Sequence, residues 1–369
     1  MDVMATEMWL KRLNARLDGV DGGEAADIRD GVLTAYLPAE AVWRGRDFDD
    51  ELMHDLRDAI LRLRGDGLFG LSLEIGSGSI KLFARRWRDG EGQTVANLKL
   101  QTPAHHEGRV YVAALNRLID LFGEGLRAIP PQDFDPAAPE RLFQGFAAAE
   151  DFVCVYGTQA VRVLSRAHGG EALARVRVLD GDEEGLIAFE SIVPSEAKTR
   201  PGTVAVEIGS GSTEIVRVDP DGRAHPVTLA IGGKTDDPPL KALERFLARS
   251  RTGHKIGRLL ESPPAVAEAF FAAAASPDAL YINASRASAK FRAFARDFHP
   301  GAGDDVRIDD RLAEAYVREY GADKFAAKVL ILLAVARGLG FGGYREGTRG
   351  GLKMGVAALL AKGLRRFGV

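Results

Sequence analysis

The chain contains the same six residues, Glu-Ile-Gly-Ser-Gly-Ser, twice, at 74–79 and again at 207–212. Each copy follows an apolar run and precedes a second strand-like stretch, which predicts a strand, a tight turn and a returning strand. Glycine lets the backbone of such a turn approach a phosphate closely, and successive turn amides with serine hydroxyls form an anion-binding nest. A carboxylate at the strand end is a ligand that Mg²⁺ prefers. The repeat therefore predicts two phosphate loops, each beside an acid.

The candidate binding residues follow from these two copies. Glu74 and Glu207 are the candidate metal ligands. Two ordinary hairpins with Gly/Ser turns are the plain alternative, but identical hexamers in matching local contexts favour a function. We expect phosphate contacts from the loop residues Gly76, Ser77, Gly78, Ser79, Gly209, Ser210, Gly211, Ser212 and Thr213.

Two further groups lie where a strand gives way to a helix. Thr158 suits the start of a helix, and Arg162 follows four residues later. Arg162 either binds phosphate or is a solvated surface residue, and the residues alone leave both open. The acids at 182–184 begin another helix, where the helix dipole alone explains them.

The bulk properties of the chain limit its class. Its 369 residues predict two domains or more, and its formal net charge of −3 argues against a nucleic-acid partner. The single cysteine, Cys154, lies in an apolar run and is expected to be a buried strand residue. Residues 1–17 lack a signal-peptide pattern, and the longest apolar run, 329–336, is shorter than the roughly 20 residues that span a bilayer. We expect a cytoplasmic protein without a membrane partner.

The pattern along the chain predicts three parts. Residues 1–66 are expected to form an N-terminal helical extension, with helices at 6–17 and 50–63, the second capped by Asp49 or Asp50 and ended by Gly65. Residues 67–196 form a first lobe with strands at 68–73, 80–87 and 94–100 and an Asp89-Gly90 turn, and then the βαβα order of an α/β domain. Residues 197–369 form a second lobe with the second loop and C-terminal helices.

Together and in this order, these elements resemble the exopolyphosphatase / guanosine pentaphosphate phosphohydrolase family of the actin-like, sugar-kinase and Hsp70 ATPase superfamily. The family loops D-I-G-S-N-S and D-I-G-G-G-S-T-E are similar to residues 74–79 and 207–214, and T-x-x-x-R matches Thr158 and Arg162. The motifs S-G-x-E-E-A and G-L-R-E-G loosely match residues 180–185 and 351–355. The resemblance runs patchily over residues 71–355 and suggests a divergent member.

The resemblance implies two RNase H-like α/β lobes with mixed sheets that face a central cleft. It also implies that Glu184 orients or deprotonates a water, that Glu74 and Glu207 hold Mg²⁺ or Mn²⁺, and that Arg162 and the loops bind terminal phosphates. Water would then attack the terminal phosphorus of polyphosphate or guanosine pentaphosphate and release orthophosphate. Family members are often dimers, so the resemblance leaves a homodimer open.

One departure from the family keeps other functions open. Both loop acids are Glu where the family has Asp, and the extra methylene moves each carboxylate by about 1.5 Å. A non-catalytic sensor of polyphosphate or nucleotide is the first alternative. An ATP-dependent kinase or ATPase of the same superfamily is the second, with Gly342-Gly343 and Gly350-Gly351 as candidate adenosine turns.

Overall fold

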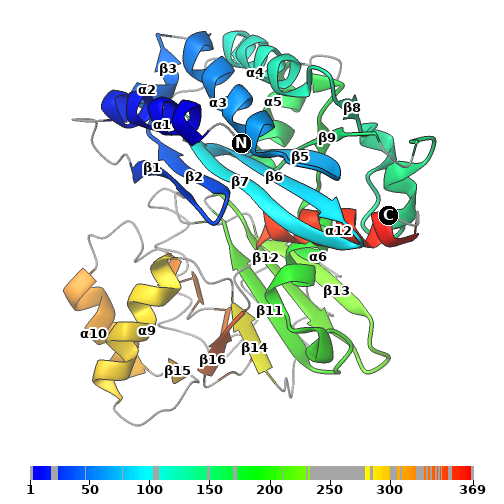
Figure 1. The fold of residues 1–369 in the computed structure, drawn as a ribbon. Helices are drawn as coiled ribbons and strands as arrows, with labels where there is room; N and C mark the ends of the chain where they lie inside the picture. The colour runs from blue at the N-terminus through cyan, green and yellow to red at the C-terminus, as the bar shows by residue number, and fades with distance from the viewer. Residues whose placement is uncertain are drawn as a thin grey trace. The chain divides into compact units, whose positions relative to one another are not determined.

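The computed structural model divides the chain into two compact units, Met1–Leu179 with Leu359–Val369, and Asp180–Ala358 (Figure 1). Each unit contains its own mixed sheet with helices packed against it, which confirms the predicted α/β class. The prediction that the two sheets face one cleft stays a prediction. The structure describes residues 3–17, 24–45, 47–76, 78–102, 108–147, 150–168, 173–209, 211–229, 232, 279–282, 286–299, 306–307, 310–320, 328–329, 331–332, 335–336, 339, 341, 343–347 and 351–366.

The first unit is built on an eight-stranded sheet in the order β1-β2-β7-β6-β5-β9-β10, with β8 beside β9. The antiparallel run β5–β6–β7 follows the chain, whereas β2 pairs parallel with β7 and β9 pairs parallel with β5. Asp89 and Gly90 both have positive φ and join β6 to β7, as the sequence predicts. The strands are β1 (Glu24–Arg29), β2 (Val32–Leu37), β5 (Leu68–Ile75), β6 (Ser79–Arg88), β7 (Glu91–Gln101), β8 (Arg127–Ala128), β9 (Phe152–Gly157) and β10 (Arg177–Val178).

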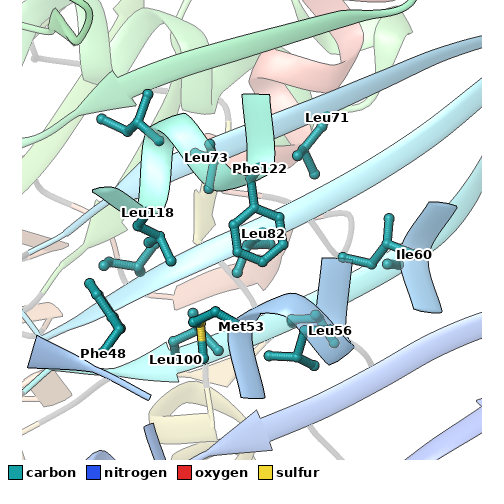
Figure 2. Packing of buried hydrophobic residues seen from close by; sticks show 14 of the residues in the cluster. Phe48, Met53, Leu56, Ile60, Leu71, Leu73, Leu82, Leu100, Leu118 and Phe122 are labelled. Atoms are coloured by element: carbon teal, nitrogen blue, oxygen red, sulfur yellow. The ribbon is translucent and has the colours of Figure 1, made fainter. Parts of the chain in front are cut away.

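Helices cover one face of this sheet and bury its leucines. Alternate residues of β5, β6 and β7 point to this face and pack against α3 and α4. Figure 2 shows Leu73, Leu82 and Leu100 among side chains of α3 and α4 such as Leu56 and Leu118. The helices of this unit are α1 (Val3–Leu17), α2 (Ala39–Val42), α3 (Asp50–Leu63), α4 (Gly108–Gly123) and α5 (Gln159–His168), with short 3₁₀ turns at Pro131–Asp133 and Pro139–Phe143.

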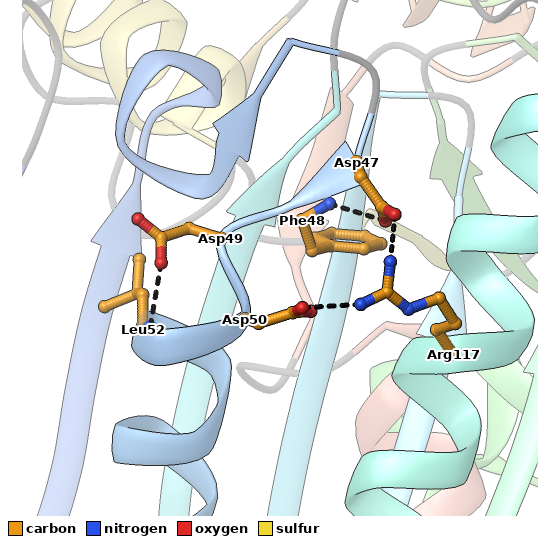
Figure 3. A network of polar contacts seen from close by, with 6 residues as sticks. All are labelled: Asp47, Phe48, Asp49, Asp50, Leu52 and Arg117. Carbon is orange, nitrogen blue, oxygen red and sulfur yellow. Dashed lines mark hydrogen bonds and ion pairs between the residues drawn. The ribbon is translucent and has the colours of Figure 1, made fainter.

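The start of α3 is fixed by three aspartates. Asp49 accepts a hydrogen bond from the backbone N–H of Leu52 (3.1 Å), so Asp49 rather than Asp50 caps the helix. Asp50 and Asp47 instead pair with Arg117 of α4 (Figure 3). Asp47 belongs to the short ribbon of β3 (Trp43–Arg44) and β4 (Asp47–Phe48). These contacts join the start of α3 to α4, and Gly65 with φ +63° follows the end of α3 as predicted.

The N-terminal segment differs from the expected helical extension. Besides α1 and α3 it contains β1 and β2, and β2 joins the first sheet beside β7. Leu33, Ala35 and Leu37 alternate with more exposed residues and point into the core, which is the period of a half-buried strand. Contacts place residues 1–66 in the same unit as the rest of the first sheet.

The second unit has a six-stranded sheet in the order β13-β12-β11-β14-β16-β15. Helix α6 covers one face, packing with Ala205 and Val216, while α9 and α10 pack on the other, with Val206 and Ile215. The described elements are α6 (Gly181–Ile192), a 3₁₀ turn at Ser195–Ala197, β11 (Thr203–Ile208), β12 (Thr213–Val218), β13 (Ala224–Leu229), β14 (Ala279–Ile282), α9 (Arg286–Phe298), β15 (Val306–Arg307), α10 (Asp310–Tyr320), β16 (Gly343–Glu346) and α12 (Leu352–Arg366), whose residues from Leu359 onward belong to the first unit.

The packing of α6 changes the predicted domain organisation. Because α6 packs on β11–β13, Glu184 lies in the second unit and not in the lobe of the first loop.

Among the residues that the structure describes, no helix has the length and hydropathy needed to cross a bilayer.

Candidate active site

The two copies of the hexamer form hairpins with the same closure. In the β5–β6 hairpin the N–H of Gly76 donates to the carbonyl of Ser79 (3.0 Å), and in the β11–β12 hairpin Gly209 donates to Ser212 (2.9 Å). The last paired residues are Ile75 with Ile80 and Ile208 with Thr213. The predicted strand–turn–strand repeat is therefore present in three dimensions. Of the predicted loop residues, Ser77 and Ser210 lie outside the described residues.

The ends of neighbouring strands gather at the first loop. The N–H of Thr158, just after β9, donates to the carbonyl of Ile75 (3.1 Å). The N–H of Thr102, just after β7, donates to the carbonyl of Gly78 (3.3 Å). Both bonds tie the loop to a rigid sheet, and a preorganised anion site needs such support.

Arg162 is a buried residue of α5. Only 9% of its surface is exposed, and its Nη1 donates to the backbone carbonyl of Leu179 (2.7 Å). The helix reaches this position because Gly157 has no side chain: a Cβ there would lie 2.6 Å from the Cβ of Val161. The solvated-surface alternative is therefore excluded, and Arg162 places a buried positive charge beside the strand ends that meet at the first loop.

Glu74 is a buried acid with a cationic partner. It is 4% exposed, forms an ion pair with Lys81, and accepts a hydrogen bond from the hydroxyl of Tyr156 (3.5 Å). Lys81 lies directly opposite Glu74 on β6, and Tyr156 lies directly opposite on β9. The charge of this carboxylate is thus compensated from within the first unit.

Glu207, at the same position in the second hairpin, has an acid opposite it. Its register partner on β12 is Glu214, and Thr228 of β13 is next in the same row. A Cβ on Gly185 of α6 would lie 3.3 Å from the Cβ of Glu214, so this row points to the face that α6 covers. Like charges directly opposite each other destabilise a sheet pair, and a bound cation relieves that repulsion.

Glu184 lies in the first turn of α6. Its N–H donates to the carbonyl of Asp180 (3.0 Å), and Asp180 and Glu183 form a reciprocal capping box that fixes this turn. Glu184 is 9% exposed, and the neighbouring Asp182 accepts a hydrogen bond from Thr228 (3.4 Å). The start of α6 therefore packs over the row that contains Glu207 and Glu214.

Sequence reasoning did not identify the roles of two residues. Glu214 lies seven positions after the acid of its hexamer, as Lys81 does after Glu74. Lys328 donates to the carbonyl of Ile208 (2.6 Å) at the second loop, and its separation of 120 residues leaves no local signal. Within the described parts of the chain, no group of three or more His, Cys, Asp or Glu side chains has metal-binding geometry.

Cys154 is a buried residue of β9, as the sequence predicts. It is 1% exposed, and burial raises the pKa of its thiol to about 12. A neutral, enclosed thiol is a poor nucleophile, so Cys154 has a packing role.

Comparison with known proteins supports the fold, so the activity has to be inferred from the residues of the site. No protein-family model and no curated protein matches the chain. Its structure is similar to that of an exopolyphosphatase from Cytophaga hutchinsonii, with a TM-score of 0.51, 14% identity, and coverage of 80% of this chain and 98% of that one. The Aquifex aeolicus PPX-GPPA enzyme follows with a TM-score of 0.48, 15% identity, and coverage of 79% and 98%. The chain thus shares the two-sheet α/β fold of an exopolyphosphatase structure.

Proposed function

We propose that the protein is a metal-dependent phosphoanhydride hydrolase that releases orthophosphate from polyphosphate, guanosine pentaphosphate or both. The observation that carries the proposal is the repeated hairpin, in which Gly76 and Gly209 make the same loop-closing hydrogen bond beside Glu74 and Glu207. The fold shared with the Cytophaga exopolyphosphatase supports this choice among phosphate-binding functions.

In this proposal the loops bind phosphate oxygens. The turn amides and hydroxyls of residues 76–79 and 209–213 donate hydrogen bonds, and small side chains leave the backbone accessible. Arg162 contributes a buried positive charge near the first loop. A guanidinium suits this task because it stays charged and offers several donors.

The proposed cation is Mg²⁺, or Mn²⁺ in its place. Glu207 and Glu214 fit it because two opposed carboxylates offer oxygen ligands and their repulsion falls when a cation binds. Glu74 is already paired with Lys81, so we assign it a positioning role rather than a place on the metal. When bound, the cation neutralises charge that develops on the phosphate oxygens.

Glu184 is the proposed base. It orients a water and accepts a proton as the water oxygen bonds to the terminal phosphorus and the phosphoanhydride P–O bond breaks. The shortened chain leaves as the second product. Glu184 suits this role because the capping box of Asp180 and Glu183 fixes the first turn of α6, and fixed geometry is what a general base needs.

The test is orthophosphate release with Mg²⁺ from medium-chain polyphosphate, guanosine pentaphosphate and ATP in parallel. Release from either of the first two, with ATP inert, is expected. Binding without turnover would instead identify a phosphate sensor, and turnover of ATP alone would identify an ATPase or kinase of the same fold.

In this proposal the protein acts on its phosphate substrate in the cytoplasm and binds neither nucleic acid nor a membrane. Light scattering tests for a homodimer.

A further inference from the structure

A row of charged and aromatic residues crosses the first sheet close to the first loop. Glu74 of β5, Lys81 of β6, Lys99 of β7 and Tyr36 of β2 are successive register partners. Directly paired residues point to the same face of a sheet, so the four side chains share one face. This face is opposite the one that carries the leucine core, because Leu82 and the other core residues alternate along the strands with the four residues of the row.

Lys81 and Lys99 lie directly opposite each other in this row, which costs stability unless other charges compensate. Glu74 pairs with Lys81, whereas Lys99 places its ammonium 5.0 Å from the centroid of the Tyr36 ring. An aromatic ring holds a cation without cancelling its charge. Lys99 is exposed, and the Lys81 side chain is 32% exposed, so both can reach a ligand from solvent.

The lysine pair lies close to the loop. Ser79, the last loop residue, pairs with Gln101 and shares the face of Lys81 two positions later, a step of about 7 Å. The carbonyl of Gly78 accepts from the N–H of Thr102, so the loop and the ends of β6 and β7 form one rigid edge. An anion held by the loop therefore has the two lysines beside it.

The arginines further along β6 do not offer the same site. Arg85 donates to the carbonyl of Gly92 (2.5 Å), and Arg86 donates to Gln93 (2.7 Å). Arg88 pairs with its neighbour Asp89 (3.6 Å). These contacts hold the guanidinium groups within the β6–β7 hairpin, and all three arginines lie further along β6 from the loop than Lys81 does.

We propose that Lys81 and Lys99 form a subsite for inner phosphates of an oligophosphate whose end lies in the first loop. The inference rests on the proposed function and extends it: the protein would bind chains of several phosphates more tightly than orthophosphate. Ammonium groups suit this role because they are compact point charges that contact successive phosphates without fixing their orientation.

The test is calorimetric binding of orthophosphate, tripolyphosphate and medium-chain polyphosphate to the full chain with EDTA present. Lys99→Met keeps the aliphatic stem over Tyr36 and removes the charge, Lys99→Arg keeps the charge, and Lys11→Met on the outside of α1 is the matched control. We expect Lys99→Met to weaken the two longer ligands about tenfold, the usual effect of one charge-assisted hydrogen bond. Orthophosphate binding by Lys99→Met should stay within about twofold of wild type. Binding of all three ligands by Lys99→Arg and by Lys11→Met should also stay within about twofold of wild type.

Equal polyphosphate binding by wild type and Lys99→Met would overturn the inference, as would an equal loss for orthophosphate. If the wild type hydrolyses polyphosphate while Lys99→Met binds it unchanged, the subsite fails and the proposed function stands. If the wild type neither binds nor cleaves any of these anions, both fail.

Discussion

Glu207 and Glu214 lie directly opposite each other on β11 and β12. In the matching hairpin of the first unit, Glu74 has Lys81 at the equivalent position. The first loop therefore has a lysine opposite its acid, and the second loop has a glutamate there. The same six residues are thus placed in two electrostatic settings, and this difference leads us to place the proposed metal at the second loop.

Replacing Glu214 with Gln should remove the repulsion and the metal response together. In the absence of metal, Glu214→Gln should be more stable than wild type by about 0.2–1 kcal/mol, the usual size of a cross-strand pair effect. The rise in melting temperature that Mg²⁺ causes in the wild type should disappear. Glu196→Gln, an exposed acid of the same unit, is the control. An unchanged Mg²⁺ response in Glu214→Gln would refute the assignment.

Glu74→Gln should behave differently because its partner is a lysine. The variant should lose about 1–3 kcal/mol of unfolding free energy, since a buried acceptor for Lys81 is weakened, and should keep the Mg²⁺-induced rise in melting temperature. Urea unfolding and thermal melts measure the two effects. Loss of the Mg²⁺ response in Glu74→Gln, with retention in Glu207→Gln, would reverse the roles of the two acids.

Gly157→Ala should disturb the contact between β9 and α5. The added Cβ would lie 2.6 Å from the Cβ of Val161, so the helix that carries Arg162 must shift. We expect a loss of about 1–3 kcal/mol in urea unfolding, typical of overpacking. The double variant Gly157→Ala with Val161→Ala removes the opposing methyl groups and should regain part of that loss. No loss in the single variant would contradict the close packing.

Cys154 should make the protein sensitive to high pH. Burial raises the thiol pKa to about 12 in the folded state, against an ordinary value of 9.0, so between these pH values the folded state stays protonated while the unfolded state loses its proton. The stability advantage is complete below pH 9 and falls as the pH rises toward 12. Cys154→Ala should lack this component of the alkaline loss. In the native wild type at pH 8, Ellman's reagent should not react; rapid reaction without unfolding would contradict the burial.

Local patterns predicted much of the fold. Apolar runs and the Gly/Ser turns located β5, β6, β11 and β12, and Asp49 and Gly65 marked the ends of α3 as expected. These signals succeed because a hairpin or a capped helix is decided by residues close in sequence. The β1–β2 pair was missed although Leu33, Ala35 and Leu37 alternate, because its place beside β7 depends on distant contacts.

The site was predictable in part. Both hairpins have the same loop length, so the residue seven positions after each acid must be its cross-strand partner, and Lys81 and Glu214 could have been found this way. The hydrogen bond from Lys328 to Ile208 joins segments 120 residues apart, and no local pattern indicates it. The assignment of Glu184 to the second unit likewise depends on how α6 packs.

The most direct test of the proposed hydrolysis is orthophosphate release from medium-chain polyphosphate with Mg²⁺ by the wild type and by Glu184→Gln at equal concentration. Circular dichroism and a thermal melt confirm that the variant is folded. We expect release by the wild type and a fall of at least about 100-fold in the variant, since positioned acid–base groups contribute rate factors on the order of 10²–10⁴. Equal release by a folded Glu184→Gln variant would contradict the central role assigned to Glu184.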